Sequence, residues 1–173
     1  MDRRHVLKTI IAASGALVAL PSWASSWTVS GIAGHQTSFA ATGQELLASV
    51  VDTIIPAGNS IGALSVGVDK FLQKLFDNCY AQDVRDNIKQ QLQRLEDLAQ
   101  LHYRKPFVAC DQLQRQELLL TFSGSEKKAE KDFFELVKSE TIRGFNTSRE
   151  VMVTYHGYKV VPGHYHGCVD VKI

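Results

Sequence analysis

The strongest constraint on the fold is a long run of apolar residues at helical spacing in the middle of the chain. Between residues 83 and 103 the apolar positions recur every three or four residues, and Gln, Arg, Lys and Asp occupy most positions between them. The recurring residues are Val84, Ile88, Leu92, Leu95, Leu98 and Ala99. This period places them on one face of an α-helix, which must pack against other elements to leave water. The pattern predicts a long amphipathic helix over 83–103.

Similar but shorter patterns lie on both sides of this helix. They predict helices over 42–55, from about 65 to 76, over 111–122 and over 125–144. Thr42 and Glu45 have the spacing of a capping box at the start of the first helix, and Pro56 stops it. Asp111 is placed to cap the fourth helix. The prediction is an all-α fold, a small helical bundle of about five helices over residues 42–147.

Irregular segments flank the predicted bundle. Residues 25–41 are rich in Ser, Gly, Ala and Thr without periodicity, which predicts an extended N-terminal arm or linker. Residues 148–173 predict an irregular C-terminal tail, in which Ser148 to Thr154 allows one more short helix. Glycines, prolines, tyrosines and histidines crowd the rest of the tail, so we expect it to lie on its own bundle or on a partner.

The first 24 residues have the order of a cleaved export signal: basic residues, an apolar run over 9–20, and a small residue at the cut. The run is shorter than the roughly 20 apolar residues that span a bilayer. The paired arginines with a following lysine resemble a twin-arginine signal, which exports folded cargo; an ordinary secretory signal is the alternative. The residues that carry this prediction are Arg3, Arg4, Leu7, Lys8 and Ala24. We therefore expect a periplasmic protein exported by the twin-arginine pathway.

The charge of the remaining chain is close to zero. Removing Arg3, Arg4 and Lys8 from the 19 basic residues, and Asp2 from the 18 acidic ones, leaves 16 and 17. There is no basic run or patch pattern of the kind that binds nucleic acid or an anionic membrane. Nucleic acid is therefore not an expected partner.

Few residues point to chemistry in this chain. It lacks the sequence motifs for covalent haem, for dinucleotide or nucleotide phosphates and for a serine nucleophile elbow. The carboxylates Asp52, Asp69 and Glu117 stand alone on amphipathic helices, where side chains are usually solvated, and we assign them no role. No catalytic, cofactor-binding or metal-binding residue is therefore predicted.

One cluster of potential metal ligands is the alternative. In an extended tail, His164, His166 and Cys168 would alternate on one side, with His156 nearby, and imidazole and thiolate suit zinc or copper. No second cysteine or carboxylate completes a tetrahedral site. Beside several tyrosines, these histidines favour an interface. The alternative function is a stand-alone periplasmic metal-binding protein.

The three cysteines are an odd number for an exported protein. Cys79 lies at a predicted helix end and Cys110 just before a helix cap, so each could be a small buried apolar residue. Cys168 lies in the glycine-flanked tail. A disulfide from Cys168 to Cys79, to Cys110 or to another chain remains open.

The first two predicted helices carry a family resemblance. Residues 51–57 (VDTIIPA), Gly62-Ala63 and residues 66–71 (VGVDKF) resemble the gluconate 2-dehydrogenase subunit 3 family. Residues 115–119, residues 145–148, and the closing Pro162-Gly163 and Gly167-Cys168 agree with it. The resemblance covers most of residues 42–168.

The resemblance implies a small, cofactor-free subunit of a membrane-associated periplasmic sugar or sugar-acid dehydrogenase. It implies a large partner subunit that binds FAD in a glucose-methanol-choline (GMC) oxidoreductase fold, and often a multi-haem cytochrome c as a third subunit. The large subunit commonly lacks an export signal, so the small one supplies it to the twin-arginine (Tat) translocase. The residues expected to bind the partner are Trp27, Tyr155, Tyr158, Pro162, Gly163, Tyr165 and Cys168.

Overall fold

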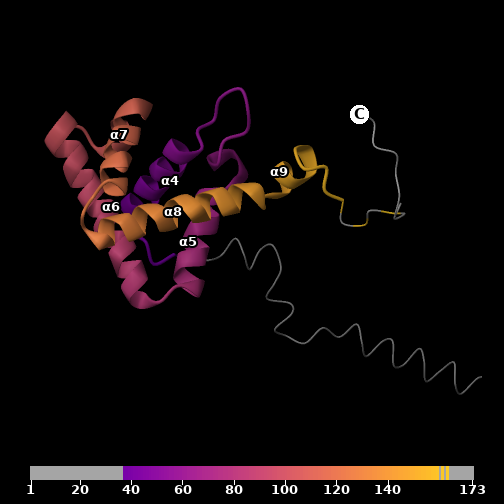
Figure 1. Cartoon of the computed structure of the whole chain (residues 1–173), viewed down its shortest axis with the longest axis horizontal. Coiled ribbons are helices and arrows are strands. Elements are labelled where there is room, and N and C mark those ends of the chain that lie inside the picture. Colours follow the sequence, from indigo (N-terminus) through magenta and orange to yellow (C-terminus); the bar gives the residue numbers. More distant parts are fainter. Residues whose placement is uncertain (1–36, 160, 162, 164–173) are drawn as a thin grey trace, which may run out of the picture. The chain divides into compact units, whose positions relative to one another are not determined.

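The computed structural model describes residues 37–159, 161 and 163. Over these residues the chain forms α-helices and short 3-10 helices, without a β-strand (Figure 1). In chain order the elements are α4 (Ala41–Ile54), η1 (Leu64–Val66), α5 (Val68–Cys79), α6 (Gln82–Tyr103), η2 (Phe107–Ala109), α7 (Gln112–Ser123), α8 (Lys128–Asn146) and α9 (Arg149–Thr154). The predicted all-α bundle is confirmed. None of the described helices combines the length and the apolar character needed to cross a membrane.

Helix α4 is the central element of the bundle. It packs against α5, α6, α7 and α8. A helix surrounded in this way must be apolar on more than one face, and α4 buries the neighbouring pairs Leu46-Leu47 and Val50-Val51. Its buried Thr53 donates its hydroxyl hydrogen to the carbonyl oxygen of Ser49 at 2.6 Å, so the burial leaves that hydroxyl paired.

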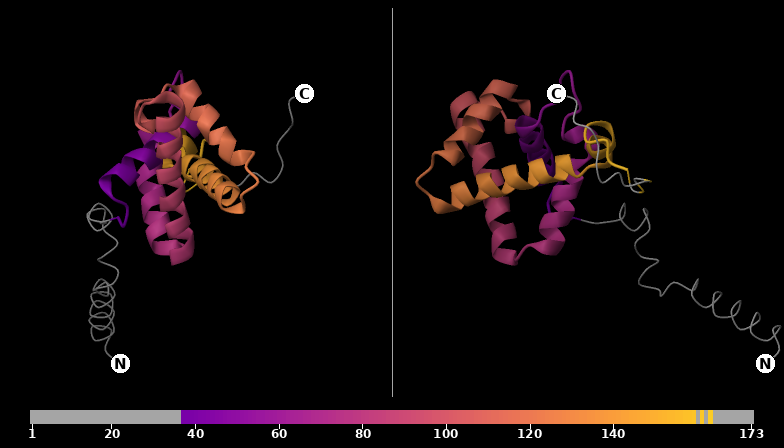
Figure 2. Two further views of the ribbon diagram at one scale, coloured as in Figure 1. Left: turned by 90° about the vertical axis from the view of Figure 1, so that its left-hand side faces the viewer. Right: turned by 45° about the vertical axis from the view of Figure 1, so that its right-hand side comes forward.

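Helix α8 crosses the other helices and closes the core. It packs against α4, α5, α6 and α7, and the right-hand view of Figure 2 shows it running across the bundle. Its buried positions Phe133, Val137, Thr141 and Gly144 recur every three or four residues, as the sequence pattern predicts for one helix face. Phe133 meets Phe122 of α7 with ring centroids 5.8 Å apart. This contact joins the end of α7 to the second turn of α8.

Most predicted helix ends agree with the structure, and one predicted cap is wrong. Asp111 forms the capping box of α7 together with Gln114, as its position suggested. Thr42, in contrast, lies inside the first turn of α4, because the helix begins at Ala41 with Ala40 as its cap residue. The side-chain amide of Gln44 donates to the carbonyl oxygen of Phe39 at 2.9 Å and helps to fix this start.

The segment before α4 is anchored where the structure describes it. Phe39 is buried in the core and packs near Phe76, with ring centroids 6.4 Å apart. The backbone N–H of Ser38 donates to the Asp77 carboxylate at 3.1 Å. The last residues of the predicted arm over 25–41 are therefore part of the bundle. Phe39 lies in the core, and Ala41 already belongs to α4.

Candidate functional site

The structure describes three of the candidate site residues predicted from sequence: Tyr155, Tyr158 and Gly163. The other candidates lie outside the described residues; they are Arg3, Arg4, Leu7, Lys8, Ala24, Trp27, Pro162, Tyr165 and Cys168. The export signal, most partner contacts and the pairing of the third cysteine therefore stay predictions.

The described part of the tail exposes large side chains. Tyr155 and Tyr158 keep 56% and 52% of their surface accessible, although the backbone N–H of Tyr158 donates to the Met152 carbonyl oxygen at 2.9 Å. Val153 and Val161 are exposed as well. The backbone is thus tied to α9 at Tyr158 while the side chains face solvent, an arrangement suited to contact with another molecule.

The described residues give no support to a metal site. His156 is exposed. Within the described ranges no three His, Cys, Asp or Glu residues are placed to share a metal ion. Of the described cysteines, Cys79 is exposed and free, whereas Cys110 is buried and free, and burial raises the pKa of the Cys110 thiol. The other tail ligands of the metal hypothesis lie outside the described residues.

The family-like sequence between α4 and α5 forms a compact loop. The N–H of Ala63 donates to the carbonyl oxygen of Ile55 at 3.0 Å, which closes the loop, and the N–H of Val68 donates to the carbonyl oxygen of Ala63 at 3.1 Å. Gly62 packs directly on Ala57: a Cβ added at Gly62 would lie 2.5 Å from the Ala57 backbone nitrogen. The Pro-Ala and Gly-Ala pairs therefore set the position of α5 relative to α4, which is a structural role.

A half-buried ion pair joins α4 to α7. Arg115 donates from Nη2 to Asp52 Oδ2 at 3.0 Å and to Gln112 Oε1 at 2.9 Å. The Gln112 amide in turn donates to the Thr53 carbonyl oxygen at 3.1 Å, near the end of α4. The expectation that Asp52 is simply solvated was wrong, because its partner comes from a helix 63 residues away in the sequence.

Glu117 also has a partner that the sequence did not reveal. It accepts a hydrogen bond from the hydroxyl of Tyr103 at 2.7 Å, and this bond raises the pKa of Tyr103. Both ionisable side chains of α7 are thus engaged by neighbouring helices. Asp69 lies in the first turn of α5, where a carboxylate complements the helix dipole.

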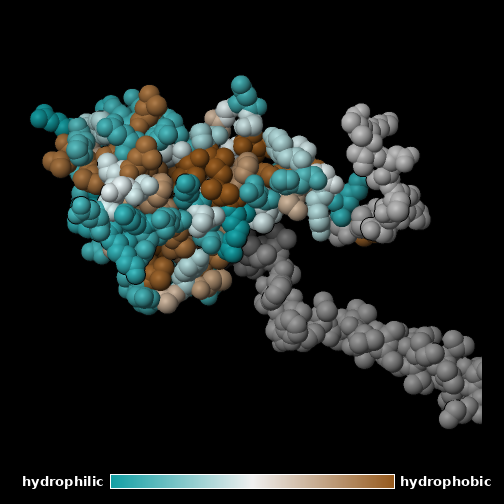
Figure 3. All heavy atoms as spheres, in the orientation of Figure 1, coloured by the Kyte–Doolittle hydropathy of each residue, from teal (hydrophilic) through white to brown (hydrophobic). Residues whose placement is uncertain are grey.

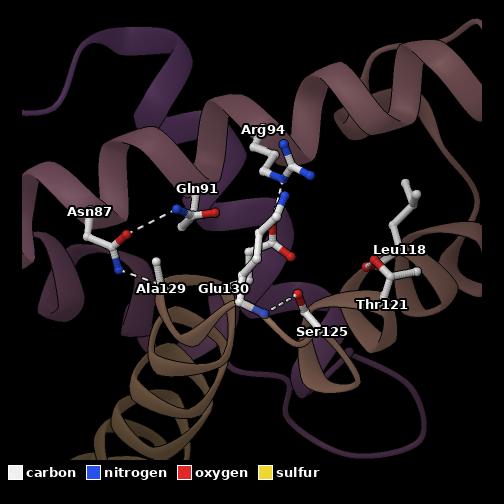
Figure 4. A network of polar contacts seen from close by, with 9 residues as sticks. Asn87, Gln91, Arg94, Leu118, Thr121, Ser125, Ala129 and Glu130 are labelled. Carbon is white, nitrogen blue, oxygen red and sulfur yellow. Dashed lines mark hydrogen bonds and ion pairs between the residues drawn. The ribbon is translucent and has the colours of Figure 1, made fainter.

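A polar network ties α6 to the start of α8 (Figure 4). Glu130 is buried and pairs with Arg94 Nε at 2.6 Å and with Lys127 Nζ at 3.4 Å. A hydrogen bond from Ser125 and the two cations hold the pKa of Glu130 below its usual value. A carboxylate that is ionised and neutralised in this way is a weak proton acceptor, so the network is suited to holding two helices together and not to acid–base catalysis.

The same network borders a polar recess of about 570 Å³ between α6 and α8. Gln91 is fixed beside it, because its amide donates to Asn87 Oδ1 at 3.0 Å and Asn87 donates to the Ala129 carbonyl oxygen at 3.1 Å. The Oε1 atom of Gln91 is sealed from solvent without a partner. Arg94 and Lys127 pair with Glu130, and Asp97 accepts a hydrogen bond from the Gln93 amide at 3.1 Å. The positive and negative charges that line the recess therefore balance, and it presents no concentrated charge to a ligand.

Comparison with known proteins identifies the family. No curated protein and no solved structure matches the chain. The family model described as gluconate 2-dehydrogenase subunit 3 matches residues 41–163, a range that begins with α4 and extends past α9. This range includes the closed loop between α4 and α5, and the α4–α7 ion pair. The chain therefore belongs to the gluconate 2-dehydrogenase subunit 3 family.

Proposed function

We propose that this chain is the non-catalytic small subunit of a periplasmic, membrane-associated, flavin-dependent dehydrogenase that acts on a sugar or sugar acid. The observation that carries the proposal is the combination of a dehydrogenase-subunit family match over 41–163 with a twin-arginine-like sequence ahead of it. The family supplies the kind of complex, and Arg3-Arg4 supplies the route of export.

In this proposal the redox chemistry belongs to the partners. A large GMC-type subunit binds FAD and oxidises the substrate, and a multi-haem cytochrome c subunit receives the electrons and holds the complex at the membrane. The small chain contributes the export signal that the large subunit lacks. Because the twin-arginine pathway carries folded proteins, the two subunits assemble before export and cross together.

The architecture of the described residues suits such an escort. The core of α4, α5, α6, α7 and α8 is continuous and rich in fully buried aromatic side chains, so the body is a rigid platform. Tyr155 and Tyr158 stand out from it with more than half of their surface accessible. Tyrosine contributes a large apolar area and a hydroxyl at low cost in side-chain entropy, which makes it a frequent anchor in protein interfaces.

The experiment replaces Arg3 and Arg4 by lysines in cells that express both subunits and measures flavoprotein in the periplasmic fraction. The proposal predicts that the variant leaves both subunits in the cytoplasm. Arg149→Lys, a charge-conserving change on exposed surface, is the matched control and should leave export unchanged.

Two results would contradict the escort role. If the flavoprotein reaches the periplasm while the small subunit does not, the large subunit is exported independently of it. The small chain is then at most an adaptor between the dehydrogenase and the cytochrome. If both subunits are exported normally with the paired lysines, the signal is an ordinary secretory one.

A further inference from the structure

Helix α7 has apolar residues on two faces, and the structure covers only one of them. Leu118, Leu119 and Phe122 face the core and are almost completely buried. Leu113 and Leu120 lie on the opposite side and keep 78% and 56% of their surface accessible. A helix that is apolar on both faces is normally buried on both. The described part of the chain therefore leaves the second face uncovered.

The exposed leucines share one stripe. Leu113, Gln116 and Leu120 are spaced by three and four residues, so they lie above one another along two turns of the helix. We call these three residues the outer face of α7. In Figure 3 hydrophobic atoms protrude over α7 and gather along the neighbouring edge of α8.

The three residues of the outer face of α7 include no ionisable side chain. Of the two ionisable residues of the helix, Arg115 is paired with Asp52, whereas Glu117 is exposed at the edge of this face and accepts a hydrogen bond from Tyr103. Helix α8 is different, since its exposed residues include Lys128, Lys131, Asp132, Glu135 and Lys138. Depletion of charge around exposed apolar side chains is the compositional mark of the core of a protein interface.

We propose that the large flavin-binding subunit docks on the outer face of α7, through an apolar stripe that the carboxylate of Glu117 borders. This inference rests on the proposed function, which supplies the partner, and it adds the place of contact. Helix α7 lies inside the family match over 41–163, so the contact belongs to the part of the chain that defines the family.

The size of the face argues against a second copy of this chain as the occupant. Helix α7 has 12 residues, which corresponds to a length of about 18 Å. Pairing it with itself would bury two leucines on each side, well short of the roughly 800 Å² per partner in a stable interface. A large subunit can cover this face and also contact α9, which lies at the other end of α8 (Figure 1).

The test uses the purified two-subunit complex and the double variant Leu113→Ser/Leu120→Ser. The matched control is Leu101→Ser. Leu101 of α6 is 75% exposed. Tyr103, two residues further on, contacts Glu117 of α7, and residues two apart in a helix point to opposite sides. Leu101 therefore points away from α7. We expect the double variant to raise the dissociation constant of the complex at least tenfold and the control to change it less than twofold. The melting temperature of the small subunit should change little in either variant, because these side chains are exposed.

Three results would overturn the proposal. If the wild-type subunits bind each other and the double variant has the same dissociation constant, α7 is not part of the interface, and the proposed escort function is unaffected. A wild-type small subunit that dimerises alone, and becomes monomeric on the double substitution, assigns the face to a second copy. Failure of the wild-type subunits to bind each other overturns the proposed function together with this one.

Discussion

The close contact between Gly62 and Ala57 makes a sharp prediction about stability. A Cβ at Gly62 would lie 2.5 Å from the Ala57 nitrogen and 2.7 Å from its Cα. Both atoms are backbone, so no side-chain rotation can relieve the clash, and the loop between α4 and α5 must open. Gly58, four residues earlier in the same loop, has no atom within 4 Å of the position where its Cβ would be. The two glycines therefore form a matched pair.

The expected effects of alanine at these two positions have opposite sign. Overpacking a tight site typically costs about 1–3 kcal/mol. Replacing glycine by alanine also restricts the unfolded chain, which stabilises by about 0.4–1 kcal/mol where the native backbone permits it. Gly62→Ala should therefore lower the free energy of unfolding by about 1–2 kcal/mol, whereas Gly58→Ala should leave it unchanged or raise it slightly. At roughly 4 °C per kcal/mol the two melting temperatures should differ by roughly 8 °C.

Thermal and urea unfolding of the purified small subunit, followed by helical circular dichroism, measures this difference. The wild-type chain provides the reference for both variants. If Gly62→Ala proves as stable as Gly58→Ala, the loop does not hold α5 in the way described, and the structural role assigned to the family sequence at this point is wrong.

Three further predictions concern the core, a helix cap and an ion pair. Phe133→Ala should cost about 3–5 kcal/mol of unfolding free energy, because the ring is fully buried against Phe122; denaturant titration checks it. Asp111→Ala should cost about 1 kcal/mol through loss of the α7 capping box, and Asp111→Asn should restore most of it. Because the pKa of Glu130 is lowered in the folded chain, its contribution is present above the unfolded pKa of the carboxyl group and is lost as the pH falls through the lower folded value. Glu130→Gln should therefore destabilise the chain at neutral pH and flatten the acid side of its stability–pH curve; an unchanged curve would contradict the pairing.

The helices could be predicted well because the signals that define a helix and its ends lie within a few residues of one another in the sequence. The period of apolar residues in α6 and the proline after α4 act over a few residues, and the observed ends of both helices agree with them within a residue or two. Asp111 was recognised as a cap for the same reason. Thr42 was misplaced because the segment before it, anchored by Phe39, lets the helix begin one residue earlier.

Pairings between distant residues could not be predicted in this way. Asp52 and Arg115 each look like an ordinary charged residue on an amphipathic helix, and only the packing of α4 on α7 brings them together. The same holds for Glu117 and Tyr103. Nor does sequence distinguish Cys79, exposed at the end of α5, from the buried Cys110. The exposure of Leu113 likewise follows from which face of α7 meets the core.

The most direct test of the central claim is to capture this chain from the periplasm by an affinity tag and to record the absorbance spectrum of what comes with it. The account predicts a partner several times larger than the 19.2 kDa chain, with a flavin spectrum that disappears when the small subunit is separated from it. A colourless chain captured alone, or a chain that keeps a bound metal after separation, would contradict the account.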